Sequence, residues 1–290
     1  FIGTHLTQEL TDKRELVYIL DHNKPVVVTD NISFIKGDFS DRKLLASILG
    51  VVDEVINLAY SSVPSSSFLQ PYLDMKYNVL PAIHFFETCL KFPNLKKIIQ
   101  MSSGGTIYGE SKAGSITEAT PCKPISAYGI SKMTIELYAN IFWRRYKLPV
   151  ICLRPANAYG PGQKAFAGQG LIATALASAV THKNLDIYGK NCVRDYVYID
   201  DLVAAMVAIL EKGKIGETYN IGTTVGISNQ ELITLIEQIT GEQLLVNYKA
   251  KRPFDVSSNI LNADKIRIDC EWAPKVKLED GIRQIFQRML

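Results

Sequence analysis

Tyr128 and Lys132 are the two residues of this chain whose types and spacing point most directly to chemistry. On a helix, residues four positions apart share one face, so the phenol and the ammonium group would lie side by side. A free phenol has a pKa near ~10, but a neighbouring positive charge favours the phenolate and lowers that value. The spacing also occurs by chance on many helices. With suitable neighbours, the pair predicts a proton-transfer device.

Those neighbours are provided by a cluster of small residues about 25 positions upstream, in the stretch Ser102-Ser103-Gly104-Gly105-Thr106-Ile107-Tyr108-Gly109. The cluster follows residues 97–101, an apolar run long enough for a buried parallel strand. Open α/β sheets bind their ligands at loops that follow the carboxyl ends of such strands. We therefore expect this loop and the Tyr128 helix to form one site.

Composition and charge exclude several classes of protein. The chain has 290 residues, 47% of them hydrophobic, and a formal charge of +3, which suits a globular protein with a substantial core. Its basic residues are mixed with acidic ones, so neither a nucleic acid nor an anionic membrane is an expected partner. The five cysteines show neither disulfide nor zinc-ligand spacing, so we expect reduced thiols and no metal. Without a signal peptide or spanning segment, a cytoplasmic location is the expectation.

The order of the predicted elements indicates an α/β fold. Strand-like runs at 16–20, 32–36, 54–59, 97–101 and 150–154 alternate with helix-length stretches, among them 71–90 and 128–146. This alternation favours a parallel sheet covered by helices. Loop-forming residues after Arg154 mark a boundary, and beyond it helices are expected at 171–182, 200–212 and 228–240, with strands at 186–188 and 218–221. We predict a first domain over 1–165 and a second mainly over 166–290, with some segments returning to the first.

The beginning of the chain carries part of a dinucleotide-binding pattern. Gly3 is followed 18 residues later by Asp21, which ends a strand-like run, and such patterns place an acidic residue about 20 positions after their glycines. Its carboxylate would bind the ribose hydroxyls, which favours NAD over NADP. Asp38 follows a second strand-like run and would lie at the same edge of the sheet. The earlier glycines and the first strand of the pattern are absent from the sequence.

Taken together, these motifs resemble the extended short-chain dehydrogenase/reductase family, and within it the NAD-dependent nucleotide-sugar epimerase and dehydratase group. The resemblance covers nearly the whole chain. It is carried by Phe1-Ile2-Gly3, Gly37-Asp38, Asn57-Leu58-Ala59, Asn78, Ser102 to Gly109, Tyr128-x-x-x-Lys132, Leu153 to Asn157, Arg194 to Val197, Asn220-Ile221-Gly222 and Arg252-Pro253-Phe254-Asp255. It implies a Rossmann-type doubly wound parallel sheet with a smaller C-terminal α/β substrate domain, and a homodimer built from helices 71–90 and 128–146.

The resemblance also implies roles for individual residues. Tyr128 would be the base that removes a sugar hydroxyl proton, and Lys132 would hold the nicotinamide ribose. The implied NAD-binding residues are Phe1, Ile2, Gly3, Asp21, Asn23, Asp38, Phe39, Leu58, Ala59, Tyr60, Asn78, Ser102, Tyr128, Lys132, Pro155 and Ala156. The implied residues for the nucleotide-sugar substrate are Ser103, Gly104, Tyr128, Asn157, Gly170, Leu171, Ile187, Tyr188, Arg194, Arg252, Asp255 and Asn259. Arginine suits this second set because its planar donors bind phosphate oxygens two at a time.

One departure from the family pattern concerns catalysis. Gly104 stands where the family usually has a Ser or Thr that donates a hydrogen bond to the reacting hydroxyl. Ser103 or Thr106 could supply this donor, and the sequence does not choose between them. Asn259 falls on a position that gates sugar size in the family and is smaller than the Tyr often found there, which suggests that N-acetylated hexoses fit.

The same loop separates the possible reactions. Gly105 and Thr106 occupy positions where dehydratases of the family have an Asp-Glu pair and decarboxylases a Glu. Removing water across two carbons requires an additional acid and base. The sequence therefore favours C4 epimerisation of a nucleotide-activated hexose, most like that of UDP-glucose 4-epimerases, through a transient 4-keto sugar. Another nucleotide-sugar reaction of the family (dehydration, decarboxylation or reduction), or a non-catalytic binding role, is the alternative.

Overall fold

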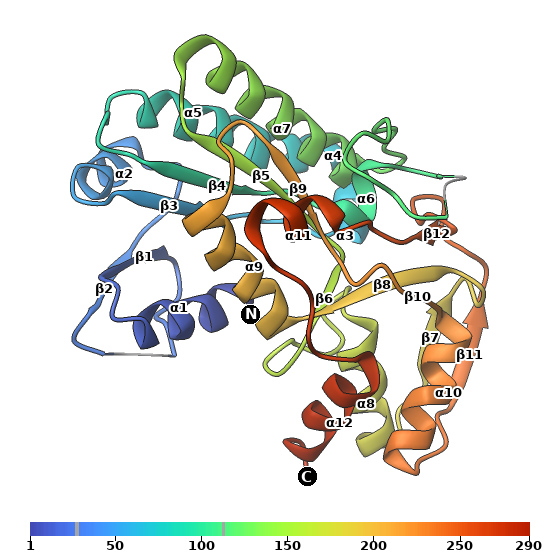
Figure 1. Ribbon diagram of the computed structural model, residues 1–290. Coiled ribbons are helices and arrows are strands. Elements are labelled where there is room, and N and C mark those ends of the chain that lie inside the picture. The colour runs from blue at the N-terminus through green and yellow to red at the C-terminus, as the bar shows by residue number, and fades with distance from the viewer. Residues whose placement is uncertain (27–28, 112–113) are drawn as a thin grey trace.

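The computed structural model describes residues 1–26, 29–111 and 114–290. A parallel sheet with the strand order β3-β4-β5-β9 runs through its centre. Its strands are β3 (Glu54–Asn57), β4 (Lys97–Met101), β5 (Val150–Pro155) and β9 (Thr218–Ile221). Next to this sheet, β1 (Val17–Asp21) and β2 (Ile32–Lys36) pair in parallel as a separate two-stranded sheet (Figure 1). These strands confirm the predicted ones, with small differences at their ends.

Helices cover both faces of the four-stranded sheet (Figure 1). One layer contains α2 (Arg42–Leu49), α5 (Leu80–Cys89) and α7 (Ala127–Tyr146), and the other contains α1 (Ile2–Asp12), α9 (Ile199–Lys212) and α11 (Asp264–Cys270). Along β4, Ile98 packs into the first layer and Ile99 into the second. Because successive strand residues face opposite sides, a strand covered on both faces reads as a continuous apolar run. This explains why the sequence pattern identified β4 and β5.

Local sequence signals set the beginnings of several helices. Asp41 accepts hydrogen bonds from the backbone N–H groups of Lys43 and Leu44 at the start of α2. Ser126 caps α7 by accepting from the N–H of Gly129, at 3.1 Å. Such caps satisfy backbone donors that have no partner within the helix. The cap at Ser126 thus fixes where the helix that carries Tyr128 and Lys132 begins.

Residues 71–90 were predicted as one helix, and the structure divides them into three parts. They are α4 (Pro71–Asp74), a π-helical turn η1 (Met75–Val79) and α5, preceded by the short α3 (Pro64–Leu69). Pro81 has no N–H to donate to the carbonyl four residues earlier, so regular α-helical bonding is interrupted here. The Asn78 side chain instead donates to the backbone oxygen of Asp74, at 2.9 Å. Single π-helical turns of this kind are frequent at functional sites.

A second region follows β5 (Figure 1, lower right). Strand β8 (Val193–Tyr198) pairs with β6 (Asn157–Tyr159), β10 (Gly226–Ser228) and β12 (Ser258–Asn259), and β7 (Leu185–Tyr188) pairs with β11 (Val246–Lys249). Helices α8 (Leu171–Thr181), α10 (Asn229–Thr240) and α12 (Leu278–Gln287) lie beside these strands. The helices at 171–182, 200–212 and 228–240 are thereby confirmed. Strand β8 is recognisable in the sequence only as a motif, and α11 and α12 were not predicted.

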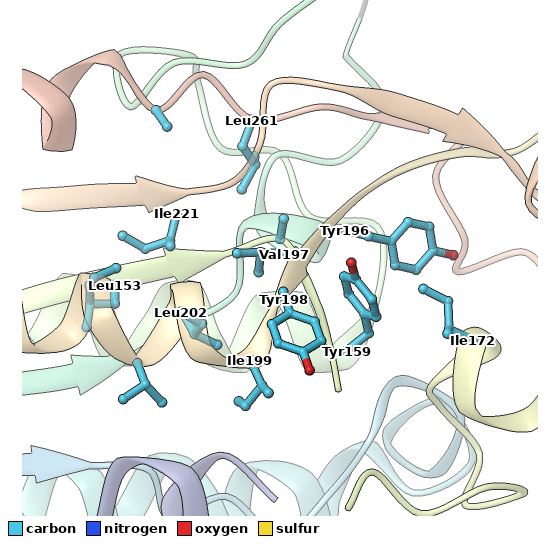
Figure 2. Packing of buried hydrophobic residues seen from close by; sticks show 14 of the residues in the cluster. Leu153, Tyr159, Ile172, Tyr196, Val197, Tyr198, Ile199, Leu202, Ile221 and Leu261 are labelled. Atoms are coloured by element: carbon cyan, nitrogen blue, oxygen red, sulfur yellow. The ribbon is translucent and has the colours of Figure 1, made fainter. Parts of the chain in front are cut away.

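The two regions share one hydrophobic core. Figure 2 shows Leu153 and Ile221 of the central sheet in the same cluster as Tyr159, Tyr196 and Ile172 of the second region. Strand β9 returns to the central sheet, where it pairs with β5. The predicted domain boundary near residue 165 stays a prediction, but a return of later segments to the first sheet is present. Because β6 follows β5 after one residue and pairs with β8, the second region begins at the carboxyl end of β5.

Candidate active site

Tyr128 and Lys132 lie one turn apart at the start of α7. The Lys132 ammonium nitrogen is 5.6 Å from the centre of the Tyr128 ring. Gly129 lets this end of the helix approach the loop after β4, because a Cβ atom there would lie 2.7 Å from the backbone oxygen of Thr106. The short helix α6 (Gly104–Ile107), which contains Thr106, packs against α7 at this point. The predicted pair and the predicted loop thus form one site.

Burial dominates the electrostatics of the pair. Lys132 is 3% exposed, and its ammonium group donates to the backbone oxygen of Met101 at 3.2 Å. Burial lowers the pKa of Lys132 to about 7, although the charges of Asp74 and Glu136 act in the opposite direction. Burial also raises the pKa of the Tyr128 hydroxyl, and Asp74 raises it further. The sequence had predicted a lowered phenol pKa, so the structure reverses the direction of this shift in the protein without ligands.

The missing hydroxyl at Gly104 has a packing explanation. A Cβ atom at Gly104 would lie 2.3 Å from Leu261 Cδ1 and 2.8 Å from the backbone oxygen of Arg154. Real Cβ atoms do not approach other atoms so closely, and one of these contacts is with rigid backbone of β5. Asn259 also donates to the Gly104 backbone oxygen, at 3.0 Å. This backbone therefore accepts only glycine at position 104.

Two hydroxyl groups remain near the predicted donor position. Ser103 Oγ and Asn157 Oδ1 both lie 3.9 Å from the position that a Gly105 Cβ would take, so they flank the same open side of the loop. Ser103 Oγ makes no hydrogen bond to the described residues. Thr106 Oγ1 and Ser102 Oγ are buried and have no partner among the described residues. The structure thus brings Ser103, rather than Thr106, together with a predicted substrate residue on an accessible surface.

The predicted cofactor residues line the carboxyl edge of the first two sheets. Phe1 is the N-cap residue of α1, and its side chain makes no capping hydrogen bond. Gly3 lies in the first turn of α1, where a Cβ atom would be 3.7 Å from Leu58, the residue after β3. Asp21 ends β1 as an exposed carboxylate whose only hydrogen bond among the described residues is from the Asn23 backbone N–H, at 2.8 Å. Helix N-termini bind phosphates and carboxylates bind ribose hydroxyls. These residues therefore fit NAD.

The other predicted cofactor residues occupy neighbouring positions. Asp38 accepts hydrogen bonds from Ser40, and these bonds lower the pKa of the Asp38 carboxyl group. Asn78 Oδ1 accepts a hydrogen bond from the Ser61 backbone N–H, at 2.7 Å. The Phe39 ring packs on Phe85 of α5, at 5.2 Å between centres. The remaining members follow strand ends: Ala59 and Tyr60 after β3, Ser102 after β4, and Pro155 and Ala156 at the end of β5. The buried Ser102 hydroxyl gives this edge an unpaired polar group that a bound cofactor can satisfy.

The predicted substrate residues fall into two groups. Near the catalytic loop, Asn157 donates to the backbone oxygen of Asp195 at 3.1 Å, and Asn259 is 1% exposed with an unpartnered Oδ1. Farther out, Arg252 forms two hydrogen bonds with Asp255, of 2.7 and 3.0 Å, and its guanidinium group lies 4.9 Å from the centre of the Tyr188 ring. The first group borders the loop after β4, and the second is a cationic and aromatic cluster of a kind that can bind a diphosphate group.

Four further predicted substrate residues lie in the second region, on β7 and β8 and at the start of α8. Arg194 is half-buried and donates to the backbone oxygen of Val193, at 2.8 Å. Gly170 takes a left-handed conformation, with φ of 85°, just before α8 begins at Leu171. The Ile187 side chain is buried in the core, so only the backbone of β7 can face a ligand at this position. Their roles remain predictions.

Sequence reasoning missed the buried polar residues behind the pair. Asp74, at the end of α4, is 2% exposed and accepts a hydrogen bond from Ser131 of α7. Glu136 of α7 forms a buried ion pair with Arg154 of β5, with a shortest N–O distance of 2.6 Å. A charged residue within an otherwise apolar helix pattern was the available signal for both carboxylates. It could not reveal which partners the folded chain provides.

Comparison with known proteins agrees with this geometry. The sequence matches the NAD dependent epimerase/dehydratase family over residues 1–222. A putative UDP-glucose 4-epimerase of Methanocaldococcus jannaschii is 31% identical over 295 residues, which cover 100% of this chain and 95% of that protein. The crystal structure of UDP-glucose 4-epimerase from Thermotoga maritima, with UDP-glucose, has a TM-score of 0.93 at 33% identity and covers 100% and 96% of the two chains.

Dehydratases are also similar. The structure of a dTDP-glucose 4,6-dehydratase from Streptomyces venezuelae, with NAD bound, has a TM-score of 0.92 at 27% identity and covers 99% of this chain and 93% of that one. The chain therefore belongs to the NAD-dependent epimerase/dehydratase family of enzymes, with their Rossmann-type fold and NAD as cofactor. Among the described residues, no helix is both long and apolar enough to cross a membrane.

Proposed function

We propose that the protein is an NAD-dependent 4-epimerase of a nucleotide-activated hexose. UDP-glucose and UDP-galactose, or their N-acetylated analogues, are the proposed substrates. The observation that carries this proposal is the loop after β4, where Gly105 and Thr106 provide neither the acid nor the base that dehydration requires. Epimerisation needs only the tyrosine, a hydroxyl donor and a cofactor that exchanges hydride.

Asp195 and Glu118, two acidic residues elsewhere in the chain, accept structural hydrogen bonds. Asp195 accepts from the Thr223 hydroxyl at 2.6 Å and from the Leu261 backbone N–H at 3.2 Å. Glu118 accepts from the Asn220 backbone N–H at 2.8 Å. Burial raises the pKa of the Asp195 carboxyl group, but its oxygens already accept from hydroxyl and backbone donors of neighbouring segments. Both carboxylates thus take part in structural hydrogen bonds, and the loop after β4 (residues 102–109) itself carries no acidic side chain.

In the proposed reaction, Tyr128 removes the proton of the C4 hydroxyl. NAD, held by the residues at the carboxyl edge of the sheets, would supply the hydride acceptor and donor for C4. Lys132 supplies positive charge beside the phenolate, and Ser103 donates a hydrogen bond to the reacting oxygen. Gly129 keeps α7 close enough to the loop for these groups to act on one atom. The side chains would thus move the proton and stabilise the reacting oxygen, and Tyr128 would return the proton to the C4 oxygen after the hydride is returned.

The substrate end of the site is proposed to hold a nucleoside diphosphate. Arg252 is oriented by Asp255 and lies between the Tyr188 and Phe254 rings, 4.9 and 4.8 Å from their centres. A guanidinium group fixed in this way can bind phosphate oxygens without first losing conformational freedom. Asn259 offers an unpartnered buried oxygen at the sugar end, and its modest size leaves room for an N-acetyl group. The nucleotide and the sugar remain proposals.

We also propose a homodimer. Helices α4, η1 and α5 pack beside α7 and leave apolar side chains exposed. These exposed residues are Tyr72, Met75, Leu80, Ile130, Leu137, Tyr138 and Ile141. A contiguous apolar surface of this kind marks an interface, and two such helix pairs can form a four-helix bundle across a two-fold axis. A cytoplasmic location stays a prediction from the sequence.

Product analysis in D₂O tests the proposed reaction. The protein is incubated with NAD and, in separate reactions, UDP-galactose, UDP-N-acetylgalactosamine and dTDP-glucose, and proton NMR follows the sugars. We expect the C4 epimer of a UDP-hexose without solvent deuterium on carbon, because hydride returns to the carbon that it left. A 4-keto-6-deoxy product that carries solvent deuterium would identify a dehydratase and contradict the proposal. Turnover of the N-acetylated sugar alone would narrow the substrate.

A further inference from the structure

Asp74 is a buried carboxylate without an ion-pair partner among the described residues, although it lies close to the catalytic pair. It is 2% exposed and ends α4, immediately before the π-helical turn. One carboxylate oxygen accepts from Ser62, from Asn78 at 3.3 Å and from Tyr60 at 3.4 Å, and the other accepts from Ser131. Burying a carboxylate is costly unless hydrogen bonds or an opposite charge compensate. These four hydrogen bonds compensate part of the cost of burial, and an opposite charge nearby would compensate it further.

Lys132 is the complementary charge. It is 3% exposed, and no carboxylate of the described residues lies within ion-pair distance of it. Its ammonium nitrogen lies 3.7 Å from the centre of the Tyr60 ring, which is close contact between a cation and an aromatic face. The same Tyr60 directs its hydroxyl to Asp74. Tyr60 thus stands between the buried cation and the buried anion, with its ring toward one and its hydroxyl toward the other.

Few other charges face Lys132. Tyr128 lies on the same helix, and its ring meets the Tyr60 ring edge-on at 5.0 Å between centres. Glu136, one turn farther along α7, forms three hydrogen bonds with Arg154, so that its charge is already balanced. Asp74 is therefore the unbalanced negative charge that acts on Lys132.

We propose that Asp74 and Tyr60 are positioning residues that keep Lys132 in its charged form beside Tyr128. This inference rests on the proposed role of Tyr128 and Lys132 in proton transfer. Burial is the main reason that the pKa of Lys132 falls to about 7, and Asp74 is the largest influence that opposes this decrease. Without the carboxylate, Lys132 would lose its proton at a lower pH. The phenolate of Tyr128 would then lose its neighbouring cation.

The proposal predicts a direct change in the titration of Lys132. In lysine-labelled protein, the Lys132 side-chain signal is assigned from its loss in Lys132→Met and followed by NMR against pH, before and after saturation with NAD. We expect Asp74→Asn to lower the Lys132 pKa by about one unit in both states, since a nearby opposite charge shifts a pKa by roughly 1–3 units. The high-pH limb of the kcat profile should move to lower pH by the same amount.

Matched variants separate charge from packing. Ser131→Ala removes one hydrogen bond to Asp74 but keeps its charge, and Tyr60→Phe keeps the aromatic face, so both should leave the Lys132 pKa nearly unchanged. Tyr60→Leu removes the face and the hydroxyl together and should lower the pKa. It provides the same test if Asp74→Asn does not fold.

Two outcomes would overturn the proposal: an unchanged or higher Lys132 pKa in folded Asp74→Asn, or in Tyr60→Leu. A shift as large in Ser131→Ala as in Asp74→Asn would assign the effect to packing and would also refute it. The NMR measurement needs no sugar turnover. If the pKa shift occurs but no hexose is epimerised, the proposed reaction fails while the positioning role stands.

Discussion

Replacing Lys132 by methionine should make the protein more stable while it abolishes activity. The pKa of this lysine falls from 10.5 to about 7 in the folded protein, mainly because of burial. A difference of about 3.5 units, at 1.36 kcal/mol for each, corresponds to a cost of up to about 5 kcal/mol for burying the charge. Methionine has a similar length and carries no charge, so the variant avoids this cost. The stability would be gained at the expense of the charge that the site uses.

The gain should depend on pH in a defined direction. Between about pH 7 and pH 10.5 the unfolded lysine holds a proton that the folded one has lost, so the stability of the unaltered protein rises with pH. The difference in the free energy of unfolding between Lys132→Met and the unaltered protein should therefore be largest near pH 6. It should fall to roughly 1 kcal/mol near pH 9.5. Urea unfolding at the two pH values measures it, with the exposed Lys164→Met as control. A variant that is less stable near pH 6, or an advantage that does not change with pH, would refute this reasoning.

Three other variants test separate parts of the structure. Gly104→Ser should lower the free energy of unfolding by about 1–3 kcal/mol, because the added atoms meet the backbone of β5. Urea unfolding measures this change, and a variant as stable as the unaltered protein would contradict the packing explanation. Glu136→Gln should lower the free energy of unfolding by about 3–5 kcal/mol, because it leaves the charge of Arg154 buried without its partner. The double variant Glu136→Gln/Arg154→Met should recover most of this loss in the same assay. Leu137→Glu places a charge on the proposed dimer surface and should give monomers in sedimentation experiments, whereas a persistent dimer would place the interface elsewhere.

The parallel sheet and the juxtaposition of Tyr128 and Lys132 on one helix could be predicted because each depends on local patterns. Strands buried on both faces read as apolar runs, and Tyr128 and Lys132 are four positions apart on a helix that Ser126 caps. The short strands around β8 pair over long distances and have weak periodicity, so only motifs indicated their importance. Boundaries inside residues 71–90 escaped prediction, because Pro81 and Asn78 act through backbone bonding that a helical pattern does not show.

The electrostatics of the site could be predicted least. From the sequence, Lys132 was expected to lower the pKa of Tyr128, but burial dominates both groups once the chain folds. Asp74 lies 58 positions before Lys132 in the sequence, and only the folded chain brings it behind the pair through Tyr60 and Ser131. The sequence showed that Gly104 lacks the expected hydroxyl, but it could not show why. In the structure, close contacts with Leu261 and the backbone of Arg154 require glycine at this position.

We propose that hydride leaves C4 of a nucleotide sugar at this site and returns to the same carbon, with Tyr128 as the base. A UDP-hexose deuterated at C4 tests this proposal most directly, with the unaltered protein and Tyr128→Phe compared in the presence of NAD. We expect a C4-epimerised product that retains its deuterium, formed by the unaltered protein and not by the variant. Loss of the deuterium to solvent, or full activity of Tyr128→Phe, would contradict it.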